Sequence, residues 1–273
     1  MANTVGVLLS VYRKDNPEWL RQSIDSLLNQ TYKDVCIYLG VDGPVGKELK
    51  NCLDGYVENK QVYIIRFEYN RGLASVLNDL IKHCKKDGIE FYARQDADDI
   101  APTNRFDLQV NYLLKHPEVD VISGAVAEMR ADGEMTGKIV PFPLTHDECR
   151  KRFRYRDPLT HPGVMFRKSF FEKVPGYRDE YRKNQDTMLW LDGFMAGCKF
   201  SNIEDVVVNF RVNEDLYKNR RGGWKQAKRM LKNRFMINKA MRYDMTAYLF
   251  ALGMFVITIM PAKIRKYIYD KRP

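Results

Sequence analysis

The 273-residue chain lacks the cysteine pattern of a disulfide-stabilised or zinc-binding protein. Its cysteines are odd in number, widely spaced and without a CxxC pair: Cys36, Cys52, Cys84, Cys149 and Cys198. Such a set is typical of reduced thiols in the cytoplasm. We also expect no signal peptide, because the apolar run from Val5 to Leu9 is too short for one and is better explained as a strand.

Glycine-rich phosphate-binding motifs are absent as well. No GxGxxG follows the first predicted strand, and no GxxxxGK[ST] occurs in the sequence. These absences argue against a dinucleotide cofactor and against a P-loop NTPase. No internal repeat or low-complexity linker is visible, and 45% of the residues are hydrophobic. We therefore expect one substantial core, or one domain with an appended segment.

Acidic residues are scarce at one end of the chain. From Arg211 onward there are 16 Lys and Arg against 4 Asp and Glu, whereas residues 1–210 carry 29 against 31. A basic tail suggests an anionic partner, either nucleic acid or a phospholipid surface. A nucleic-acid-binding protein of this size normally carries its basic patch on the folded domain, and this body is near neutral. We therefore expect an anionic membrane surface, and no nucleic acid, as the partner.

The first hundred residues alternate between strand and helix patterns. Apolar runs predict strands at 5–9, 35–41, 62–67 and 89–93; periodicity predicts helices at 17–28, capped by Asn16, and at 72–83. Further on, we expect helices at 102–115 and 185–196 and strands at 119–129, 164–166 and 206–210. Repeated βα units predict an α/β fold with a Rossmann-like, mostly parallel central sheet flanked by helices.

Polar residues follow several predicted strands at their carboxyl ends: Ser10–Tyr12, Asp42, Asn70–Arg71 and Asp96–Asp99. Loops at this edge of a parallel sheet form the usual ligand crevice. Their common location predicts a nucleotide site.

The acidic loop is the most informative of these segments. In extended backbone, alternate side chains point the same way, so Asp96 and Asp98 can converge on one object. Two close carboxylates repel each other unless a cation lies between them, and oxygen ligands suit Mg²⁺ or Mn²⁺ shared with substrate phosphates. The alternative is an acidic turn in which Asp99 caps the helix that Pro102 opens.

Taken in order, these motifs resemble inverting glycosyltransferases of family 2, which have the GT-A fold. The resemblance covers about residues 3–240 and is nearest to bacterial enzymes of capsule, exopolysaccharide and O-antigen synthesis. The matching segments are Ser10–Tyr12, Gln30–Tyr32, Val41–Gly43, Asn70–Gly72 with Asn78, the Asp-x-Asp loop Asp96–Asp99, Asn104–Phe106 and His161–Phe166.

The resemblance implies a role for each matching residue. Val11, Tyr12, Asp42 and Arg71 would line the uracil and diphosphate pocket, Asp96 and Ala97 would contact the nucleotide sugar, and Asp98 would bind Mn²⁺ or Mg²⁺. The catalytic base of such enzymes is the Asp of a Glu-Asp pair before a Leu-Trp helix, which makes Asp186 the candidate here. Gln185 replaces the usual Glu, which puts in doubt the acceptor contact of that residue.

The implied chemistry is consistent on its own terms. Displacement at an anomeric carbon needs a base for the acceptor hydroxyl and a metal for the departing diphosphate. A carboxylate suits the base role when partial desolvation raises its pKa. Position alone favours Asp186 as an ordinary acidic residue in the first turn of a helix, and the resemblance favours it as the base.

Four further residues have two readings each. His161 could be a third metal ligand or acceptor contact, or a hydrogen-bonded histidine beside Pro162. Arg220 and Arg221 could bind the donor diphosphate or a lipid-linked acceptor phosphate, with Trp224 stacking on sugar, or all three could form a solvated basic turn.

The tail predicts two helices. In the first, Trp224 to Met241, residues Ala227, Leu231 and Phe235 oppose a basic face. The second, Met245 to Ala262, has no charge and spans about 27 Å, which is marginal for crossing a bilayer. Flanking basic residues favour a helix lying in the cytoplasmic interface of a membrane, which the resemblance implies is the bacterial inner membrane; the alternative is a helix packed in a core or dimer.

We therefore expect a GT-A catalytic domain at 1–222, with a nucleotide-binding half (1–100) and an acceptor half (101–222), followed by a basic, membrane-associating segment at 223–273. The resemblance implies an inverting, metal-dependent enzyme that moves sugar from a UDP-sugar to a glycan acceptor on a polyprenyl diphosphate, in bacterial surface polysaccharide synthesis. Two alternatives are a sugar-phosphate nucleotidyltransferase, disfavoured because no Gly-rich, Lys-bearing loop follows the first strand, and a non-catalytic basic membrane- or nucleic-acid-binding protein.

Overall fold

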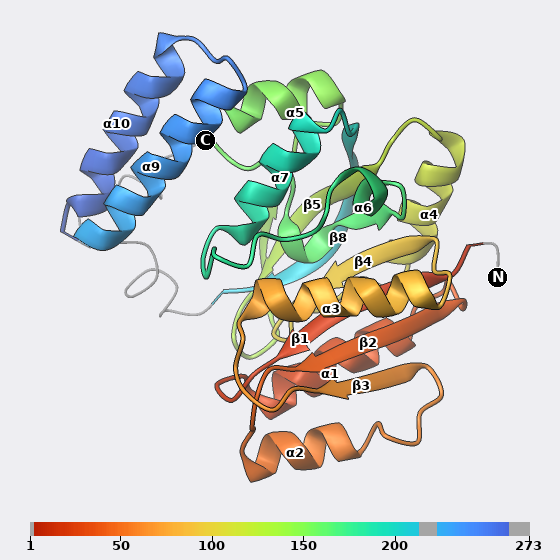
Figure 1. Ribbon diagram of the computed structural model, residues 1–273. Helices are drawn as coiled ribbons and strands as arrows, with labels where there is room; N and C mark the ends of the chain where they lie inside the picture. Colours follow the sequence, from red (N-terminus) through yellow and green to blue (C-terminus); the bar gives the residue numbers. More distant parts are fainter. Residues whose placement is uncertain (1–2, 213–222, 262–273) are drawn as a thin grey trace.

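The computed structural model describes residues 3–212 and 223–261. Within them, one sheet has the strand order β3-β2-β1-β4-β7-β5-β6, and β8 pairs with β5 beside this path (Figure 1). The strands are β1 (Val5–Val11), β2 (Val35–Val41), β3 (Val62–Arg66), β4 (Phe91–Gln95), β5 (Val121–Met129), β6 (Met135–Val140), β7 (Met165–Arg167) and β8 (Phe200–Arg211).

The first half of the sheet confirms the predicted strands and the helices α1 and α3, and it adds a helix, α2, that was not predicted. Strands β1 to β4 run parallel and are connected by α1 (Pro17–Leu28), α2 (Lys47–Asp54) and α3 (Leu73–Lys86). Asn16 caps α1 as predicted, because its side-chain oxygen accepts hydrogen bonds from the backbone N–H groups of Glu18 and Trp19. All four strands therefore end at the same edge of the sheet.

The second half is more irregular than expected. Strand β7 is antiparallel to both β4 and β5, and β6 is antiparallel to β5, whereas β8 runs parallel to β5. The helices of this half are α4 (Arg105–Lys115), α5 (His146–Phe153), α6 (Phe170–Lys173) and α7 (Gln185–Met195). The sheet is thus parallel at its core and mixed at its far side.

Several predicted boundaries were wrong, and the largest differences are in β4, α4 and β8. Strand β4 begins and ends two residues later than expected, and α4 begins at Arg105 rather than Pro102 because a turn precedes it. Strand β8 begins at Phe200, six residues before the predicted start. The exposed pair Glu204 and Asp205 interrupts its apolar pattern, and these residues lie where the pairing with β5 shifts register.

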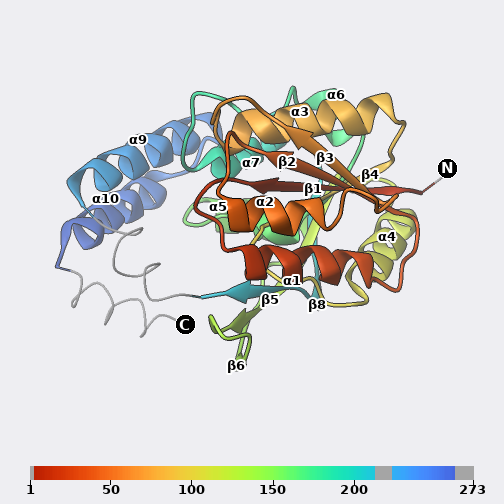
Figure 2. The same ribbon diagram turned by 90° about the horizontal axis from the view of Figure 1, so that it is seen from below.

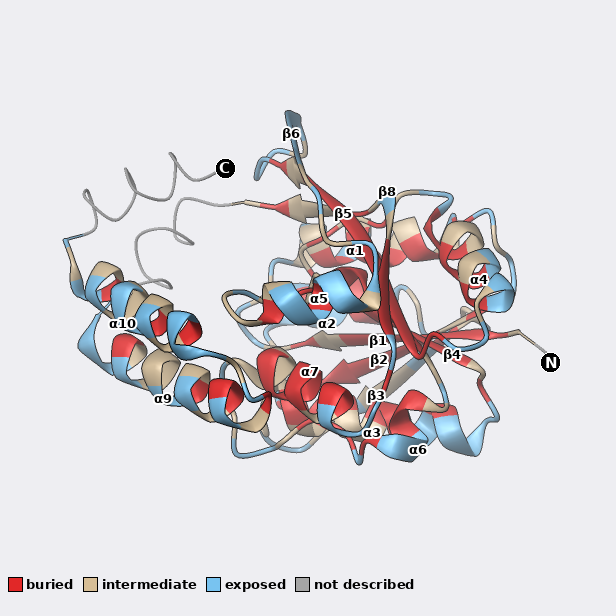
Figure 3. Cartoon of the chain, turned by 90° about the horizontal axis from the view of Figure 1, so that it is seen from above, coloured by how far each residue is buried: buried red, intermediate tan, exposed pale blue. Residues whose placement is uncertain are grey.

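Helices cover both faces of the sheet (Figure 2). One apolar cluster lies between the sheet and α1, α2 and α4, and includes Leu20, Leu53 and Phe106. The other lies under α3 and α7 and includes Leu77 and Trp190. Figure 3 shows the strands of the central sheet as buried and the tip around β6 as exposed.

The C-terminal helices α9 (Trp224–Ala240) and α10 (Met245–Ile259) lie side by side against the end of α7 (Figure 1). Ile237 and Met241 belong to the same apolar cluster as Trp190, so α9 packs on the body. The predicted apolar face of α9 is only partly correct. Phe235 is 37% exposed and contacts the Tyr248 ring of α10, whereas Asn233 and Ile237 are buried.

Helix α10 is shorter than the predicted run and ends at Ile259. Its small residues Ala247 and Ala251 are buried, while large apolar side chains form an exposed stripe: Met245, Leu249, Leu252, Val256 and Ile259. A helix that exposes this stripe is not a core helix of the chain, so the core alternative was wrong, while packing in a dimer stays a prediction. None of the helices in residues 3–212 and 223–261 combines the length and apolarity that crossing a bilayer requires.

Candidate active site

A pocket of about 500 Å³ lies at the edge where β1 to β4 end. Its lining comes from the last residues of β1 and β4, the loops that follow the four strands and the first residue of α3, together with one residue each from the 175–184 segment and β8: Ser10, Tyr12, Asp15, Asp42, Asn70, Gly72, Leu73, Arg94, Asp96, Ala97, Asp98, Arg182 and Phe210. We call it the strand-end pocket. The sheet topology therefore brings together the polar loops that the sequence grouped.

The acidic loop forms one wall of this pocket. Carboxylate oxygens of Asp96, Asp98 and Asp99 lie within 4.8 Å of one another. Asp96 forms an ion pair with the buried guanidinium of Arg94, and its backbone carbonyl accepts a hydrogen bond from the Ser23 hydroxyl at 2.9 Å. The loop is thus held from α1 and from β4 beneath it.

Asp99 is fully buried and does not cap a helix, so that alternative was wrong. Its Oδ1 accepts a hydrogen bond from the Arg211 backbone N–H at 2.8 Å, and Oδ2 has no partner among the described residues. Burial, followed by the charges of Asp96 and Asp98, raises the pKa of Asp99 well above its ordinary value. A buried carboxylate oxygen without a partner beside two more carboxylates fits a divalent cation with oxygen ligands.

Two buried arginines fix the backbone of this loop. The Arg211 guanidinium donates hydrogen bonds to the carbonyls of Asp98 and Ala131, at 2.8 and 2.9 Å. Arg105 donates to the carbonyl of Arg94 and to the side chain of Gln95, and burial lowers its pKa to about 9. Arg105 of the Asn104–Phe106 segment, which belongs to the sequence resemblance, thus supports the strand that leads into the acidic loop and does not line the pocket. Arg211 was missed because it stands beyond the predicted end of its strand.

Asp42 organises the neighbouring loop. It is 4% exposed, and its carboxylate accepts hydrogen bonds from the Asn70 side chain and from the backbone N–H groups of Arg71 and Gly72, at 2.7 to 2.9 Å. Gly43 has a φ of 84° and a Cβ there would lie 2.7 Å from the Asn70 nitrogen, so only glycine fits. Asp42 therefore shapes the pocket as well as lining it.

The predicted nucleotide-binding residues fall into two groups. Tyr12, Asp42, Asp96 and Ala97 line the strand-end pocket, as does the predicted metal ligand Asp98. The other group does not line it. Val11 is fully buried in the core, and Arg71 forms an ion pair with Asp79 while its guanidinium lies 4.1 Å from the centre of the Phe67 ring. The nucleotide contacts of Val11 and Arg71 stay predictions.

Arg182 is one of two arginines that line the pocket, with Arg94, and the sequence did not single it out. It contacts Gly72, whose φ is 91°, and a Cβ on residue 72 would collide with the Arg182 guanidinium. The segment that carries Arg182 is held to α3 by Asn78, whose amide donates to the Tyr177 carbonyl and accepts from the Tyr177 N–H, both at 2.8 Å. Gly72 and Asn78, which belong to the sequence resemblance, were the residues that could have indicated a role for the segment that carries Arg182.

Asp186 lies in the first turn of α7 and is half-buried. Burial is the largest cause that raises its pKa to about 7; the negative charge of Asp157 is next, and Asp96 adds to it. A hydrogen bond from the Thr187 N–H at 2.8 Å acts in the opposite direction. A carboxylate with a pKa near neutrality is suited to accept a proton at working pH. The charges of Asp186 and of the acidic loop therefore interact.

His161 is hydrogen-bonded rather than grouped with the carboxylates. Its Nε2 lies 2.9 Å from the Tyr177 hydroxyl, and its ring lies edge-on to Trp190. Burial, followed by the charge of Arg94, holds the pKa of His161 well below its ordinary value. Among the described residues, the group of side chains that could hold a metal ion is Asp96, Asp98 and Asp99, without His161. This geometry favours the hydrogen-bonded alternative; its role as a ligand stays a prediction.

The remaining candidates lie elsewhere. Trp224 starts α9, is 56% exposed and packs edge-on against Phe255, outside the strand-end pocket. Arg220 and Arg221 lie outside the described residues. Gln185 precedes Asp186, and its Oε1 is buried without a hydrogen-bond partner in the described part of the chain.

Sequence comparison decides the family. The profile described as "Glycosyl transferase family 2" matches residues 7–175, which run from within β1 to beyond β7. The chain belongs to glycosyltransferase family 2. It is a glycosyltransferase, as the resemblance implied.

Two relatives of this family 2 enzyme match over nearly their whole length. One is "UDP-Gal:alpha-D-GlcNAc-diphosphoundecaprenol beta-1,3-galactosyltransferase" of Escherichia coli, 30% identical over 97% of this chain and 94% of that protein. The other is "Amylovoran biosynthesis glycosyltransferase AmsE" of Erwinia amylovora, 30% identical over 97% of both chains.

Solved structures confirm the GT-A fold of the family 2 enzyme. S. aureus TarS 1–349 in complex with UDP has a TM-score of 0.62 at 16% identity, covering 97% of this chain and 86% of that one. GalNAc-T7 with UDP, GalNAc and Mn²⁺ has a TM-score of 0.65 at 18% identity, covering 87% and 48%. At these identities the likeness concerns the fold alone.

Proposed function

We propose that this glycosyltransferase moves a sugar, with inversion, from a UDP-sugar to a glycan acceptor linked to a polyprenyl diphosphate. The observation that carries the proposal is a carboxylate with a raised pKa close to a pocket lined by carboxylates. Asp96 and Asp98 line the strand-end pocket, and Asp186 on the neighbouring helix has a pKa raised to about 7 by burial first, then by the charge of Asp157, with a smaller contribution from Asp96. Support for the donor and the acceptor comes from the printed name of the E. coli relative.

The strand-end pocket is proposed to bind the donor. Tyr12, Asp42, Asp96 and Ala97 would contact the nucleotide sugar, and Arg182 would pair with its diphosphate. Asp98, supported by Asp99, would hold Mn²⁺ or Mg²⁺. A bound divalent cation would neutralise charge that develops on the departing diphosphate. Arg211 and Arg105 contribute by keeping the loop backbone in place before substrate arrives.

Asp186 is proposed as the base that takes the proton of the acceptor hydroxyl. Its raised pKa allows it to hold that proton while the oxygen attacks the anomeric carbon from the side opposite the diphosphate. A single direct displacement of this kind inverts the configuration. Because Gln185 replaces the usual Glu, the neighbouring side chain would contact the acceptor as a neutral amide.

Membrane association is proposed for the segment from residue 223 onward. The exposed apolar stripe of α10 lies on a chain segment with a large excess of basic residues, a combination that favours the anionic cytoplasmic face of a bacterial inner membrane. This location would bring the enzyme to a lipid-linked acceptor. We therefore keep the proposed boundary at residue 222, with the catalytic domain before it and the membrane-associating segment after it.

Thermal unfolding with a panel of nucleotide sugars tests the donor proposal, with Mn²⁺ in one series and EDTA in the other. We expect UDP and its sugars to raise Tm with Mn²⁺ and much less with EDTA, and the most protective sugar to identify the donor. The anomeric configuration of the transferred sugar, measured by NMR, then tests inversion. A nucleotidyltransferase would instead release diphosphate from a nucleoside triphosphate, and a non-catalytic protein would respond to no nucleotide.

A further inference from the structure

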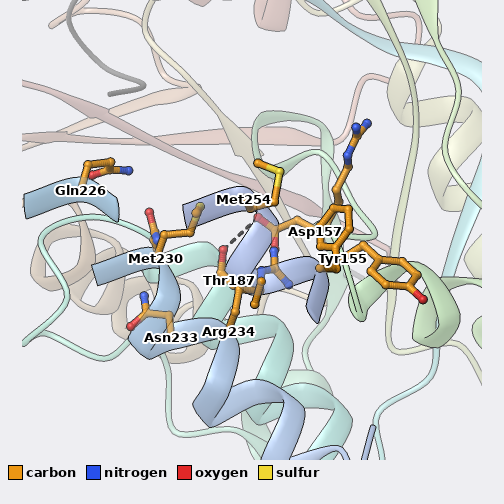
Figure 4. Close-up of a pocket in the computed structure, with 12 residues that line it drawn as sticks. Tyr155, Asp157, Thr187, Gln226, Met230, Asn233, Arg234 and Met254 are labelled. Atoms are coloured by element: carbon orange, nitrogen blue, oxygen red, sulfur yellow. Dashed lines mark hydrogen bonds and ion pairs between the residues drawn. The ribbon is translucent and has the colours of Figure 1, made fainter. Parts of the chain in front are cut away.

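A second pocket, of about 370 Å³, lies between the start of α7 and the C-terminal helix pair (Figure 4). We call it the helix-pair pocket. It is lined by Tyr155, Arg156, Asp157, Asn184, Thr187, Gln226, Met230, Asn233, Arg234, Phe250, Ala251 and Met254. Asn184 and Thr187 stand on either side of Asp186 in the sequence, so the pocket borders the proposed catalytic base.

One side of the helix-pair pocket is built for an anion. Arg156 and Arg234 both line it. The Arg234 guanidinium is fixed, because it donates a hydrogen bond to the Phe153 carbonyl at 2.9 Å and lies 3.4 Å from the Asp157 carboxylate. The Asp157 carboxylate lies in the same pocket and is paired with Arg234 and with the Thr187 hydroxyl at 2.8 Å, an interaction drawn in Figure 4, so part of its charge is neutralised.

Asn233 is the second, independent sign of a ligand. Its side chain is only 4% exposed, it lines the helix-pair pocket, and its Nδ2 has no hydrogen-bond partner among the described residues. A buried amide N–H without a partner costs free energy unless a bound group accepts its hydrogen bond. A phosphate oxygen beside the two arginines would be such an acceptor.

The helix-pair pocket also has an apolar part. Met230, Phe250, Ala251 and Met254 contribute to it, and the last three belong to α10. The same helix carries the exposed apolar stripe on its outer side. An anionic group beside the arginines and a hydrocarbon chain along α10 could therefore belong to one amphiphilic ligand.

We propose that the helix-pair pocket binds the diphosphate and the first isoprene units of a prenyl-diphosphate-linked acceptor, with Asn233 and Arg234 contacting the phosphate. This inference rests on the proposed function and specifies where the lipid end of that acceptor lies. The pocket would present the acceptor sugar to Asp186 from the side of the membrane-associating helices. Because its lining comes from α9 and α10, these helices would be part of the acceptor site and not only an anchor.

The test measures binding of farnesyl diphosphate to the full chain by calorimetry, with saturating UDP and Mn²⁺ so that the strand-end pocket is occupied. We expect farnesyl diphosphate to bind, and both farnesol and inorganic diphosphate to bind at least tenfold more weakly. Asn233→Asp, which places a negative charge against the phosphate, should weaken farnesyl diphosphate binding about tenfold or more, and Asn233→Leu should weaken it less. Asn238→Asp is the matched control, because Asn238 is equally buried on α9 but does not line the pocket.

Equal binding of inorganic diphosphate, or unchanged binding in both Asn233 variants, would overturn the assignment. An equal loss in the Asn238 control would also overturn it, since the effect would then come from packing of α9. Failure of the proposed function has a different signature. In that case UDP with Mn²⁺ gives no thermal protection to the wild-type chain, whatever farnesyl diphosphate does.

Discussion

The two pockets of this molecule are built in different ways. The strand-end pocket stands on the ends of parallel strands, and buried arginines bonded to backbone carbonyls hold its acidic loop. The helix-pair pocket is assembled from side chains of three helices and the 155–157 segment, with one guanidinium bridging them. A nucleotide diphosphate is common to many transferases, whereas acceptors differ. A rigid backbone frame suits the first ligand, and exchangeable helix side chains suit the second.

The largest effect should come from the residue between the two pockets. Asp186→Asn removes the proposed base while keeping its shape, and we expect turnover to fall about 10²- to 10⁴-fold. UDP-sugar binding should be retained, because Asp186 does not line the strand-end pocket. Initial rates and donor-induced thermal protection measure the two. Asp192→Asn on the same helix, where Asp192 pairs with Arg178, is the control. Full activity of Asp186→Asn would remove it from the mechanism.

The frame of the strand-end pocket should matter next. Arg105→Leu leaves two buried carbonyls and two glutamine side chains without their donor. We expect a loss of about 2–4 kcal/mol in the free energy of unfolding, and weaker protection by Mn²⁺ with UDP. Denaturant unfolding measures the free energy of unfolding, and calorimetry measures the binding of Mn²⁺ and UDP. A stable variant with normal metal affinity would show that the loop does not depend on this network.

Substitutions of two arginines near the strand-end pocket should have different effects, one on donor binding and the other on stability. Arg182→Ala is expected to raise the KM for the UDP-sugar about tenfold with little change in Tm, because Arg182 is exposed and lines the pocket. Arg71→Ala should do the reverse, since it breaks the pair with Asp79 and the contact with Phe67. Donor titrations and thermal unfolding of both variants check this. The opposite pattern would support the nucleotide contact that the sequence resemblance assigned to Arg71.

The smallest effect on chemistry should come from the exposed stripe. Leu249→Glu, at a position 63% exposed, should reduce binding to anionic phospholipid vesicles about tenfold and leave transfer to a short water-soluble acceptor unchanged. Val57→Glu is the matched control, because Val57 is 56% exposed on the donor half. Sedimentation with vesicles measures the binding. Equal loss in both variants, or in neither, would argue against α10 as the attached surface.

The sequence predicted the strand-end pocket better than the helix-pair pocket. Strands β1 to β4 and the loops after them were predictable, because long apolar runs and helical periods repeat there and topology then fixes which loops meet. Helix α5 was missed because only Cys149 and Phe153 of its eight residues are buried, which leaves little periodicity. Arg211 and Asn233 could not be predicted, and only the Gly72 and Asn78 positions gave a signal for Arg182. Their partners lie far away in the sequence, and a single chain does not indicate which arginine reaches which pocket.

The most direct test of the central claim is the pH dependence of kcat/KM for sugar transfer. If Asp186 is the base, activity should be low when it is protonated and rise to a plateau as pH passes about 7. The negative charge of Asp157 helps to raise that pKa, so Asp157→Asn should move the rise to lower pH. A profile that is flat between pH 5 and 8, or one that does not move in Asp157→Asn, would contradict Asp186 as the base.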